Sequence, residues 1–276
     1  MSRVVLPASL DELWQELDRQ PDALIYAGGT DLLPRLRKKP QKGRGLICLE
    51  RLSELKRIEQ RGDEISIGAG CTHAQLLDSP LIRERLPILA QALKVLGSPL
   101  IRNAATIGGN LVTASPAGDT LPPLYALGAI LEIVGPGASR RVAIGDFIKG
   151  PGQTALLPGE LLSAVIVNSP EQSVLHHFEK LGQRAALAIS IASLAALLRI
   201  DPAGVVLKAR LAWGSLGPTV ITCRPAEAAL EGRRLSHESL TRAAALAKEA
   251  VSPIDDIRAS AAYRREVAGN LLLRLA

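Results

Sequence analysis

The spacing of apolar residues in the N-terminal third of the chain predicts a helix followed by short strands. Apolar residues recur on one helical face from Leu10 to Leu17. Ser9 and Glu12 stand at the spacing of a capping box, so we expect a helix of about ten residues to begin after Ser9. Thr72 could cap a later helix. Apolar runs bounded by turn residues predict strands at 23–26, 45–49 and 64–70.

The rest of the chain continues this mixture. Helices are expected at 87–96 and 122–127, and strands at 131–134 and 140–144 form a hairpin. The proline- and glycine-rich run 150–159 indicates a boundary. Beyond it the pattern predicts strands at 173–180, 189–200 and 205–213, then helices at 225–230, 237–250 and 260–275. The expected fold class is therefore α+β, with a C-terminal module of a hairpin plus helices.

The formal net charge is +6, and the densest basic run comprises Arg35, Arg37, Lys38, Lys39, Lys42 and Arg44. A nucleic-acid interface is disfavoured because only 3% of the residues are aromatic, and none lies within this run to stack on a base. The run is either a solvated surface loop or a docking surface for an acidic protein partner.

Length and composition fit a globular protein of two or three small domains, because 276 residues that are 47% hydrophobic suffice to bury a core. No stretch approaches the roughly 20 apolar residues that span a bilayer. Met1–Leu10 lacks the pattern of a secretory signal, so a cytoplasmic location is expected. Cys48, Cys71 and Cys223 are widely separated, which argues against a disulfide framework and against an iron–sulfur cluster in this chain.

One segment, Gly68–His73, comes near to the Gly-x-Gly-x-x-Gly turn of a dinucleotide-binding fold. His73 occupies the position of the third glycine, where close packing of helix and strand requires a residue without a side chain. A Walker-type phosphate loop is also absent from the sequence. The two common phosphate-binding folds are therefore unsupported.

Two other segments have the chemistry to bind a diphosphate: Ala27–Leu32, the first glycine loop, and Ala105–Asn110, the second glycine loop. In the first, glycines let the backbone approach an anion and turn N–H groups toward it, and Thr30 adds a hydroxyl donor. In the second, Thr106 and Asn110 supply side-chain donors beside a glycine pair. The two loops could clamp a diphosphate from both sides, although each alone is also compatible with a plain turn.

Together with Gly97–Asn103 and Ser115–Asp119, the glycine loops resemble the signature of the flavoprotein subunits of xanthine dehydrogenase, carbon monoxide dehydrogenase and related molybdenum hydroxylases. Their order and spacing are specific. The resemblance covers nearly the whole chain, continuing through Asp146–Phe147, Pro158–Glu160, Phe178–Lys180, Asp256–Ser260 and Tyr263–Arg265.

This resemblance implies a FAD-binding fold of the vanillyl-alcohol oxidase type in residues 1–170, with subdomains at about 1–55 and 56–170 that hold FAD between them. It also implies a C-terminal α+β domain of the carbon monoxide dehydrogenase flavoprotein type in residues 171–276. The cofactor would be bound without a covalent link.

The resemblance also implies which residues contact FAD. The diphosphate would lie on both glycine loops. Thr113, Gly118 and Asp119 would hold the adenosine half, and Ile101 would pack on the cofactor. Leu162 and Lys180, both assigned to the C-terminal domain, would reach the isoalloxazine. No catalytic residue and no metal ligand is expected in this chain. The implied cofactor-binding residues are Ala27, Gly28, Gly29, Thr30, Asp31, Leu32, Ile101, Thr106, Gly109, Asn110, Thr113, Gly118, Asp119, Leu162 and Lys180.

The function implied by the resemblance is that of an electron-transfer subunit. FAD would receive electrons from [2Fe-2S] clusters on a small partner subunit and pass them to an external acceptor, while a large subunit carries the molybdenum cofactor, in a dimer of heterotrimers. The alternatives are a self-sufficient flavin oxidase, which the low aromatic content and the lack of an evident acid/base pair disfavour, and a nucleotide-binding assembly protein.

Two differences from relatives limit which branch of the family the chain can resemble. Three dispersed cysteines exclude the cysteine-rich insert with which some members bind a four-iron cluster. The apolar segment Arg184–Ser190 lacks an acidic residue that many relatives have, so membership of the carbon monoxide branch is in doubt. The substrate of the complex and its electron acceptor stay open.

Overall fold

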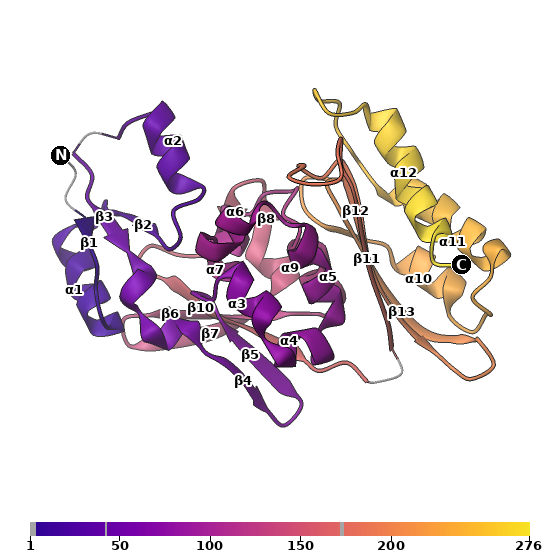
Figure 1. Ribbon diagram of the computed structural model, residues 1–276, viewed down its shortest axis with the longest axis horizontal. Coiled ribbons are helices and arrows are strands. Elements are labelled where there is room, and N and C mark those ends of the chain that lie inside the picture. Colours follow the sequence, from indigo (N-terminus) through magenta and orange to yellow (C-terminus); the bar gives the residue numbers. More distant parts are fainter. Residues whose placement is uncertain (1–3, 42, 172–173) are drawn as a thin grey trace.

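The computed structural model describes residues 4–41, 43–171 and 174–276. Three main sheets stand in a row along the long axis of the molecule, each with its own helices (Figure 1). A small two-stranded sheet completes the fold. The three main sheets define a first, a second and a third unit, at residues 4–56, 58–168 and 174–276.

The first unit is a parallel sheet in the order β1–β3–β2 with a helix against it. The predicted cap of α1 is confirmed, because the Ser9 hydroxyl oxygen accepts a hydrogen bond of 3.2 Å from the Glu12 N–H. Leu13 and Ile47 are fully buried in a small core. The elements are β1 (Val4–Val5), α1 (Leu10–Arg19), β2 (Leu24–Tyr26), α2 (Leu32–Lys38), β3 (Leu46–Cys48) and the 3-10 helices Leu49–Arg51 and Ser53–Lys56.

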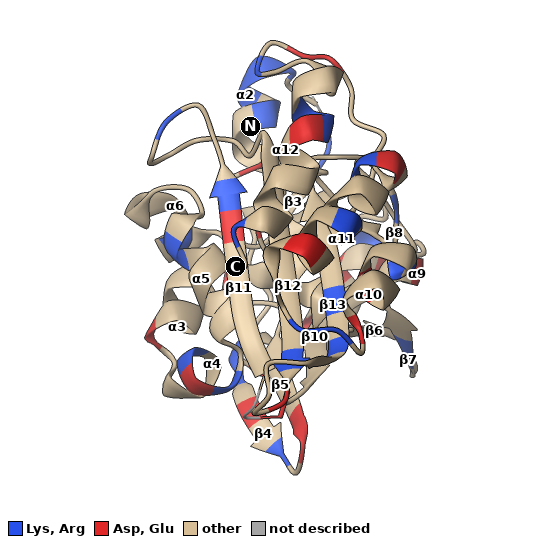
Figure 2. Ribbon diagram, turned by 90° about the vertical axis from the view of Figure 1, so that its right-hand side faces the viewer, with Lys and Arg blue, Asp and Glu red and all other residues tan. Residues whose placement is uncertain are grey.

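Helix α2 differs from the rest of the first unit because it buries none of its residues. It stands apart from the sheet in Figure 1 and carries a band of basic residues in Figure 2. The basic run is therefore helical where it begins: Arg35, Arg37 and Lys38 lie in the last turn, where positive charge complements the helix dipole. Lys42 lies outside the described residues.

The second unit is an antiparallel sheet in the order β4–β5–β10–β6–β7, with helices packed on one face (Figure 1). Thr72 caps α3 in a complete capping box with Gln75, as its position predicted. The elements are β4 (Ile58–Arg61), β5 (Glu64–Gly68), α3 (His73–Asp78), α4 (Pro80–Arg85), α5 (Pro87–Val95), α6 (Pro99–Ala104), α7 (Ile107–Thr113), α8 (Leu121–Ala126), β6 (Ile130–Gly135), β7 (Ala138–Ala143), α9 (Ile144–Phe147), β8 (Ile148–Gly150), β9 (Gln153–Thr154) and β10 (Leu161–Asn168).

The position of β10 corrects the expected boundary at 150–159. After the turn at Pro158–Gly159 the chain returns to the second sheet as its central strand, between β5 and β6. Four consecutive residues of β10, Ala164–Val167, are buried, as expected of a strand covered on both faces. The proline- and glycine-rich run is therefore an excursion within the second unit.

The third unit is a sheet in the order β11–β12–β13–β14, with α10, α11 and α12 on its outer face (Figure 1). Its largest fully buried side chain is that of Trp213, whose indole N–H donates a 3.1 Å hydrogen bond to the Ala268 carbonyl. The elements are β11 (Val174–Leu181), β12 (Ala192–Ile200), β13 (Val206–Gly214), β14 (Ile221–Thr222), α10 (Arg224–Leu230), α11 (His237–Ala250) and α12 (Ala261–Leu273).

Strand β12 joins the second and third units through its two faces. Ala195 and Leu197 belong to the core of the second unit, whereas Leu194 and Leu198 belong to that of the third. This division follows from the alternation of side chains along a strand. Because both faces of the sheet are buried, the third unit is packed firmly against the helices of the second.

The cysteines, potential metal ligands and helix lengths of the described residues limit the kinds of site that this part of the chain can form. Cys48, Cys71 and Cys223 are buried free thiols. Within the described ranges, no group of three or more His, Cys, Asp or Glu side chains could hold a metal ion. Nor is any helix found there that is both long and apolar enough to cross a membrane.

Candidate functional site

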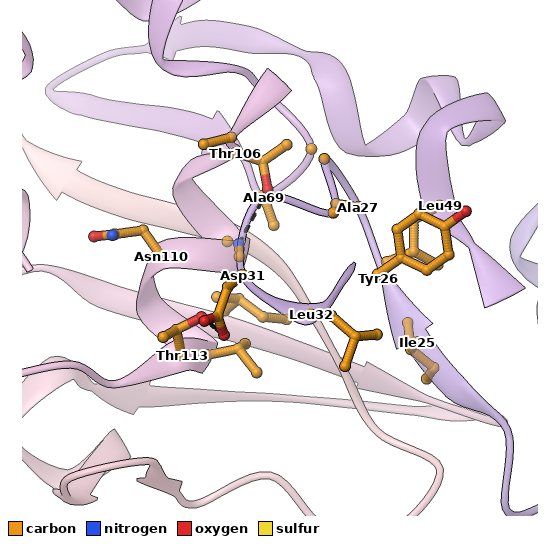
Figure 3. A pocket seen from close by; sticks show the side chains of 18 of the residues that line it. Ile25, Tyr26, Ala27, Asp31, Leu32, Leu49, Ala69, Thr106, Asn110 and Thr113 are labelled. Atoms are coloured by element: carbon orange, nitrogen blue, oxygen red, sulfur yellow. Dashed lines mark hydrogen bonds between the residues drawn. The ribbon is translucent and has the colours of Figure 1, made fainter. Parts of the chain in front are cut away.

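A cavity of about 330 Å³ lies between the first and second units. Its volume is within the range of about 300–1,000 Å³ that is usual for small-molecule sites. Figure 3 shows its wall, built from the segment after β2 on one side and α7 on the other. Most of the residues implied by the resemblance line it: Ala27, Gly28, Gly29, Thr30, Asp31, Leu32, Thr106, Gly109, Asn110, Thr113 and Leu162.

The first glycine loop connects β2 to α2 and presents free donors. Among the described residues, the backbone N–H groups of residues 28–32 have no hydrogen-bond acceptor. Gly29 has a φ of +69°, in the left-handed region that favours glycine. A Cβ on Gly28 would lie 1.7 Å from the Ala104 carbonyl oxygen, so only glycine allows the loop to approach α6 so closely. The loop can therefore offer several N–H groups to an anion in the cavity.

Asp31 ties this loop to the opposite wall. Its carboxylate accepts a hydrogen bond of 3.2 Å from the Thr113 hydroxyl and lies 3.5 Å from the guanidinium of Arg35. Figure 3 shows the Asp31 and Thr113 side chains pointing toward one another. Both bonds engage the Asp31 carboxylate, and Arg35 supplies a compensating positive charge at the rim of the cavity.

The second glycine loop is not an open loop, because α7 begins at Ile107 and includes both glycines. Its first three N–H groups already have acceptors. Ile107 donates to the Cys71 carbonyl at 3.0 Å, Gly108 to the Ala69 carbonyl at 2.9 Å, and Gly109 to the Thr106 hydroxyl at 3.0 Å. The backbone N–H groups of residues 107–109 are therefore not available to a ligand, and the Thr106 hydroxyl oxygen serves as the N-cap acceptor of α7.

The two glycines of α7 have different roles. A Cβ on Gly108 would lie 2.6 Å from the Cβ of Ala69, so this glycine allows α7 to pack on the end of β5. A Cβ on Gly109 would meet only the Thr106 hydroxyl, at 3.0 Å, and Gly109 lines the cavity. Gly109 therefore leaves room for a ligand.

Asn110 is the donor that α7 does contribute. Its side-chain carbonyl accepts a hydrogen bond of 2.6 Å from the Thr120 hydroxyl, which fixes the orientation of the amide. The amide nitrogen has no acceptor among the described residues, so its two N–H groups are free. The expectation that Asn110 is a side-chain donor remains open to test.

Four residues implied by the resemblance do not line the cavity: Ile101, Gly118, Asp119 and Lys180. Asp119 and Lys180 form an ion pair of 2.6 Å in which each side chain is only 7% exposed. The Lys180 ammonium also donates to the Val95 carbonyl at 3.4 Å. Burial raises the pKa of the Asp119 carboxyl, and the charge of Lys180 opposes that rise.

This ion pair bears on the expected positions of Asp119 and Lys180 along the cofactor. The resemblance assigned Asp119 to the adenosine half and Lys180 to the isoalloxazine, whereas the structure places their charged groups 2.6 Å apart. The position of Leu162 is a correction, because it lies in β10 of the second unit and not in the C-terminal domain. Thr120 connects the pair to the cavity, because it follows Asp119 in the chain and bonds to Asn110.

Sequence reasoning missed several residues of the cavity wall. Ala69 and Gly70 come from the segment that was rejected as a dinucleotide turn, yet they line the cavity. Glu160 also lines it and is paired at 2.7 Å with Arg140, whose hydrogen bond lowers the pKa of Glu160 to about 2. Glu160 was part of the motif Pro158–Glu160 that carried the resemblance, which was a usable signal. The other missed wall residues include Ile25, Tyr26, Arg35, Leu49, Leu55 and Leu156.

Comparison with known proteins places the chain among flavin-binding subunits. Residues 1–170 match the family described as FAD binding domain in molybdopterin dehydrogenase, and residues 176–276 match the family described as CO dehydrogenase flavoprotein C-terminal domain. The chain is 32% identical to the nicotinate dehydrogenase FAD-subunit of Eubacterium barkeri, over 94% of this chain and 90% of that one. It is 33% identical to the xanthine dehydrogenase FAD-binding subunit of Escherichia coli O157:H7, over 93% and 88%.

Solved structures agree with the sequence comparison. A chain of carbon monoxide dehydrogenase from Hydrogenophaga pseudoflava superimposes with a TM-score of 0.93 at 30% identity, covering 99% of this chain and 95% of that one. A chain of quinoline 2-oxidoreductase from Pseudomonas putida 86 gives a TM-score of 0.94 at 31% identity, covering 99% and 95%. The expected fold, a FAD-binding domain followed by a domain of the carbon monoxide dehydrogenase flavoprotein type, is therefore confirmed.

Proposed function

Because the chain belongs to the family of FAD-binding subunits of molybdenum hydroxylases, we propose that it passes electrons from [2Fe-2S] clusters of a partner subunit to an external acceptor. It is an oxidoreductase subunit with an FAD-binding domain. The observation that supports the cofactor site most directly is the first glycine loop, whose free N–H groups line a cavity between two units.

The residues present fit FAD. A diphosphate needs hydrogen-bond donors and close approach of the backbone, and residues 28–32 offer both. Asn110 adds two N–H groups from the opposite wall, and Gly109 leaves the space between them open. Tyr26, Leu49 and Leu162 supply the larger side chains that a small-molecule site needs beside its polar groups.

Each residue then has a defined task. When bound, FAD supplies the capacity to accept electrons singly and release them in pairs. The first glycine loop binds the diphosphate, and the Asp31–Thr113 bond keeps the two walls together. Lys180 would supply a positive charge toward the isoalloxazine end, where it would favour the negative charge that accompanies reduction. Asp119 holds Lys180 in place, and we therefore place Asp119 at the isoalloxazine end as well.

The proposed partners are a large subunit with the molybdenum cofactor and a small subunit with [2Fe-2S] clusters, assembled as a dimer of heterotrimers in the cytoplasm. Relatives with names such as medium chain and FAD-subunit support a multi-subunit enzyme. Helix α2 is the proposed docking element, because it buries no residue and carries Arg35, Arg37 and Lys38. Its charge would steer an acidic partner at low salt.

We keep the division of the chain near residue 170 as a proposal. The two family matches support it, since one ends at residue 170 and the other begins at residue 176. The division into subdomains at about residue 55 also agrees with the separate sheets of the first and second units.

The proposal is tested by reconstitution. We expect the purified chain to take up one FAD. The isolated chain should show no substrate oxidation until the molybdenum and iron–sulfur subunits of its complex are restored. Complex formation should weaken at high ionic strength. Substrate oxidation by the chain alone would instead identify a self-sufficient oxidase, and uptake of nucleotide without any flavin reduction in the complex would identify an assembly protein.

A further inference from the structure

The edge of β11 that faces away from β12 is held by one side chain. The Gln91 amide nitrogen donates a 3.1 Å hydrogen bond to the His176 carbonyl, and the Phe178 N–H donates a 2.7 Å bond to the Gln91 side-chain oxygen. His176 and Phe178 are alternate residues of an antiparallel strand, so both direct their backbone groups toward this free edge. The carboxamide of Gln91 therefore satisfies one acceptor and one donor of a strand edge that has no neighbouring strand.

The helix that carries Gln91 makes a second contact with the same strand. Gln91 and Val95 lie four residues apart on one face of α5, and the Val95 carbonyl accepts a hydrogen bond from the Lys180 ammonium. Four helical residues advance about 6 Å, and two strand residues advance about 6.6 Å. The spacing of Phe178 and Lys180 along β11 therefore matches that of Gln91 and Val95 along α5, so Phe178 can bond to Gln91 while Lys180 bonds to Val95.

The face of β11 toward α5 is the one that carries Lys180. Side chains at positions 176, 178 and 180 point to the same side of the strand, and Phe178 packs on the core of the second unit. On this face the Lys180 ammonium reaches the Asp119 carboxylate at 2.6 Å, with both side chains nearly inaccessible to solvent. The other Asp119 oxygen is buried without a partner. A shift of β11 along α5 would therefore separate a buried charge from its counter-ion.

We propose that Gln91 is a positioning residue for Lys180: its carboxamide fixes β11 on α5 and so keeps the Lys180 ammonium beside Asp119 and the isoalloxazine. This inference rests on the proposed function, because it takes Lys180 to be the cation that the flavin meets. Among the described residues, the hydrogen bonds of the Gln91 side chain are to backbone atoms of β11.

The test measures the midpoint potential of the flavin in the assembled complex for Gln91→Met, Lys180→Met and the double variant. Methionine has nearly the length of glutamine and removes both hydrogen bonds. Removal of a cation near the flavin lowers the potential, so Lys180→Met should lower it, and Gln91→Met should lower it by a smaller amount. In the double variant the change at Gln91 should add nothing, because coupled sites are not additive.

A matched control separates this role from general loosening of the strand. The Arg274 guanidinium donates a 2.8 Å hydrogen bond to Glu179, whose side chain points to the other face of β11. Arg274→Met should leave the potential unchanged, and FAD content measured for every variant reports a folding defect. Equal and additive shifts at Gln91 and Lys180, or a shift with Arg274→Met as large as with Gln91→Met, would overturn the role of Gln91. No shift with Lys180→Met would contradict the assignment of Lys180 itself, and the role of Gln91 with it.

Discussion

The two glycine loops have similar sequences and opposite hydrogen-bonding states. Residues 28–32 leave their backbone N–H groups without acceptors among the described residues, whereas residues 107–109 donate theirs to Cys71, Ala69 and Thr106. One loop can therefore bind an anion through its backbone, and the other can only shape the cavity and support Asn110. A glycine pair in the sequence indicates that other atoms approach the backbone closely. Whether those atoms belong to a ligand or to the protein itself depends on the surrounding structure.

Each loop uses one glycine for packing and one for another purpose. Gly28 lies against the Ala104 carbonyl and Gly108 against Ala69, in both cases with no room for a Cβ. Gly29 instead adopts a φ of +69°, and Gly109 faces the cavity. Variants at these positions should therefore have different effects on stability and on FAD affinity.

The most severe change should be Gly28→Ala. The new Cβ would lie 1.7 Å from a backbone oxygen, so α6 and the loop must move apart. We expect a loss of about 3 kcal/mol in the free energy of unfolding, at the upper end of the usual cost of overpacking, together with loss of FAD. Denaturant unfolding and flavin content measure both. Gly145→Ala, where a Cβ meets nothing closer than 3.9 Å, is the control, and a Gly28 variant as stable as that control would contradict the packing role.

Gly109→Leu should affect binding without a comparable loss of stability. Its Cβ meets only the Thr106 hydroxyl at 3.0 Å, and the side chain would extend into the cavity. We expect FAD affinity to fall by about a hundredfold or more, equivalent to about 2.7 kcal/mol, with the unfolding midpoint close to that of the parent. Full flavin content in a folded Gly109→Leu protein would show that the diphosphate does not lie on α7.

Asn110 tests whether α7 contributes a donor at all. Asn110→Ala should weaken FAD by about 1.5–3 kcal/mol if the amide meets a charged oxygen. Asn110→Asp keeps an acceptor for the Thr120 hydroxyl but replaces both N–H donors with negative charge, so it should bind FAD more weakly than the alanine variant. Thr120→Val, which removes only the orienting bond, is the control. Titration of flavin fluorescence measures all three, and equal affinities would exclude Asn110 from the site.

Asp119→Ala distinguishes the two ends of the cofactor. If Asp119 holds Lys180 at the isoalloxazine, the variant should weaken FAD and FMN by a similar factor, because both contain the isoalloxazine. Weaker FAD with unchanged FMN would place Asp119 at the adenosine, as the resemblance first implied. Paired titrations of the two flavins decide between these outcomes, and Lys180→Met should behave in the same way as Asp119→Ala.

The smallest expected effect is a loss of folding stability at acid pH that is caused by His73, whose backbone contacts the second glycine loop. His73 is fully buried, and its backbone N–H donates to the Ala105 carbonyl at 3.0 Å. Burial of the imidazole, assisted by the charge of Arg102, lowers its pKa to about 4. The unfolded chain takes up a proton below about pH 6.5, whereas the folded chain does not until about pH 4. Stability should therefore fall by about 1 kcal/mol between pH 7.5 and 5.5. His73→Leu should remove this part of the pH dependence of the unfolding midpoint.

The sequence predicted those elements whose signals are local. The cap at Ser9, the capping box at Thr72 and the strands of the hairpin after Gly128 are all present. Helix α7 was missed because a glycine costs about 1 kcal/mol in a helix, and contacts with Ala69 and Cys71, far away in the sequence, override that cost. Strand β10 was missed because a proline- and glycine-rich run immediately precedes it.

In the candidate site, too, local features could be predicted from the sequence and contacts between distant residues could not. Short motifs identified most of the cavity wall, because glycines and their polar neighbours carry the relevant chemistry locally. The pairing of Asp119 with Lys180 joins residues 61 positions apart, and the contact of Gln91 with Phe178 joins residues 87 apart. Such contacts depend on how the second and third units pack, which no local pattern encodes.

The most direct test of the central claim is amide hydrogen exchange, measured residue by residue by NMR with and without FAD. The account predicts that FAD slows exchange strongly at the amides of residues 28–32, which lack acceptors, and changes little at residues 107–109, whose amides are already bonded. Protection confined to residues 107–109, with fast exchange retained at 28–32, would contradict the assignment of the diphosphate to the first glycine loop.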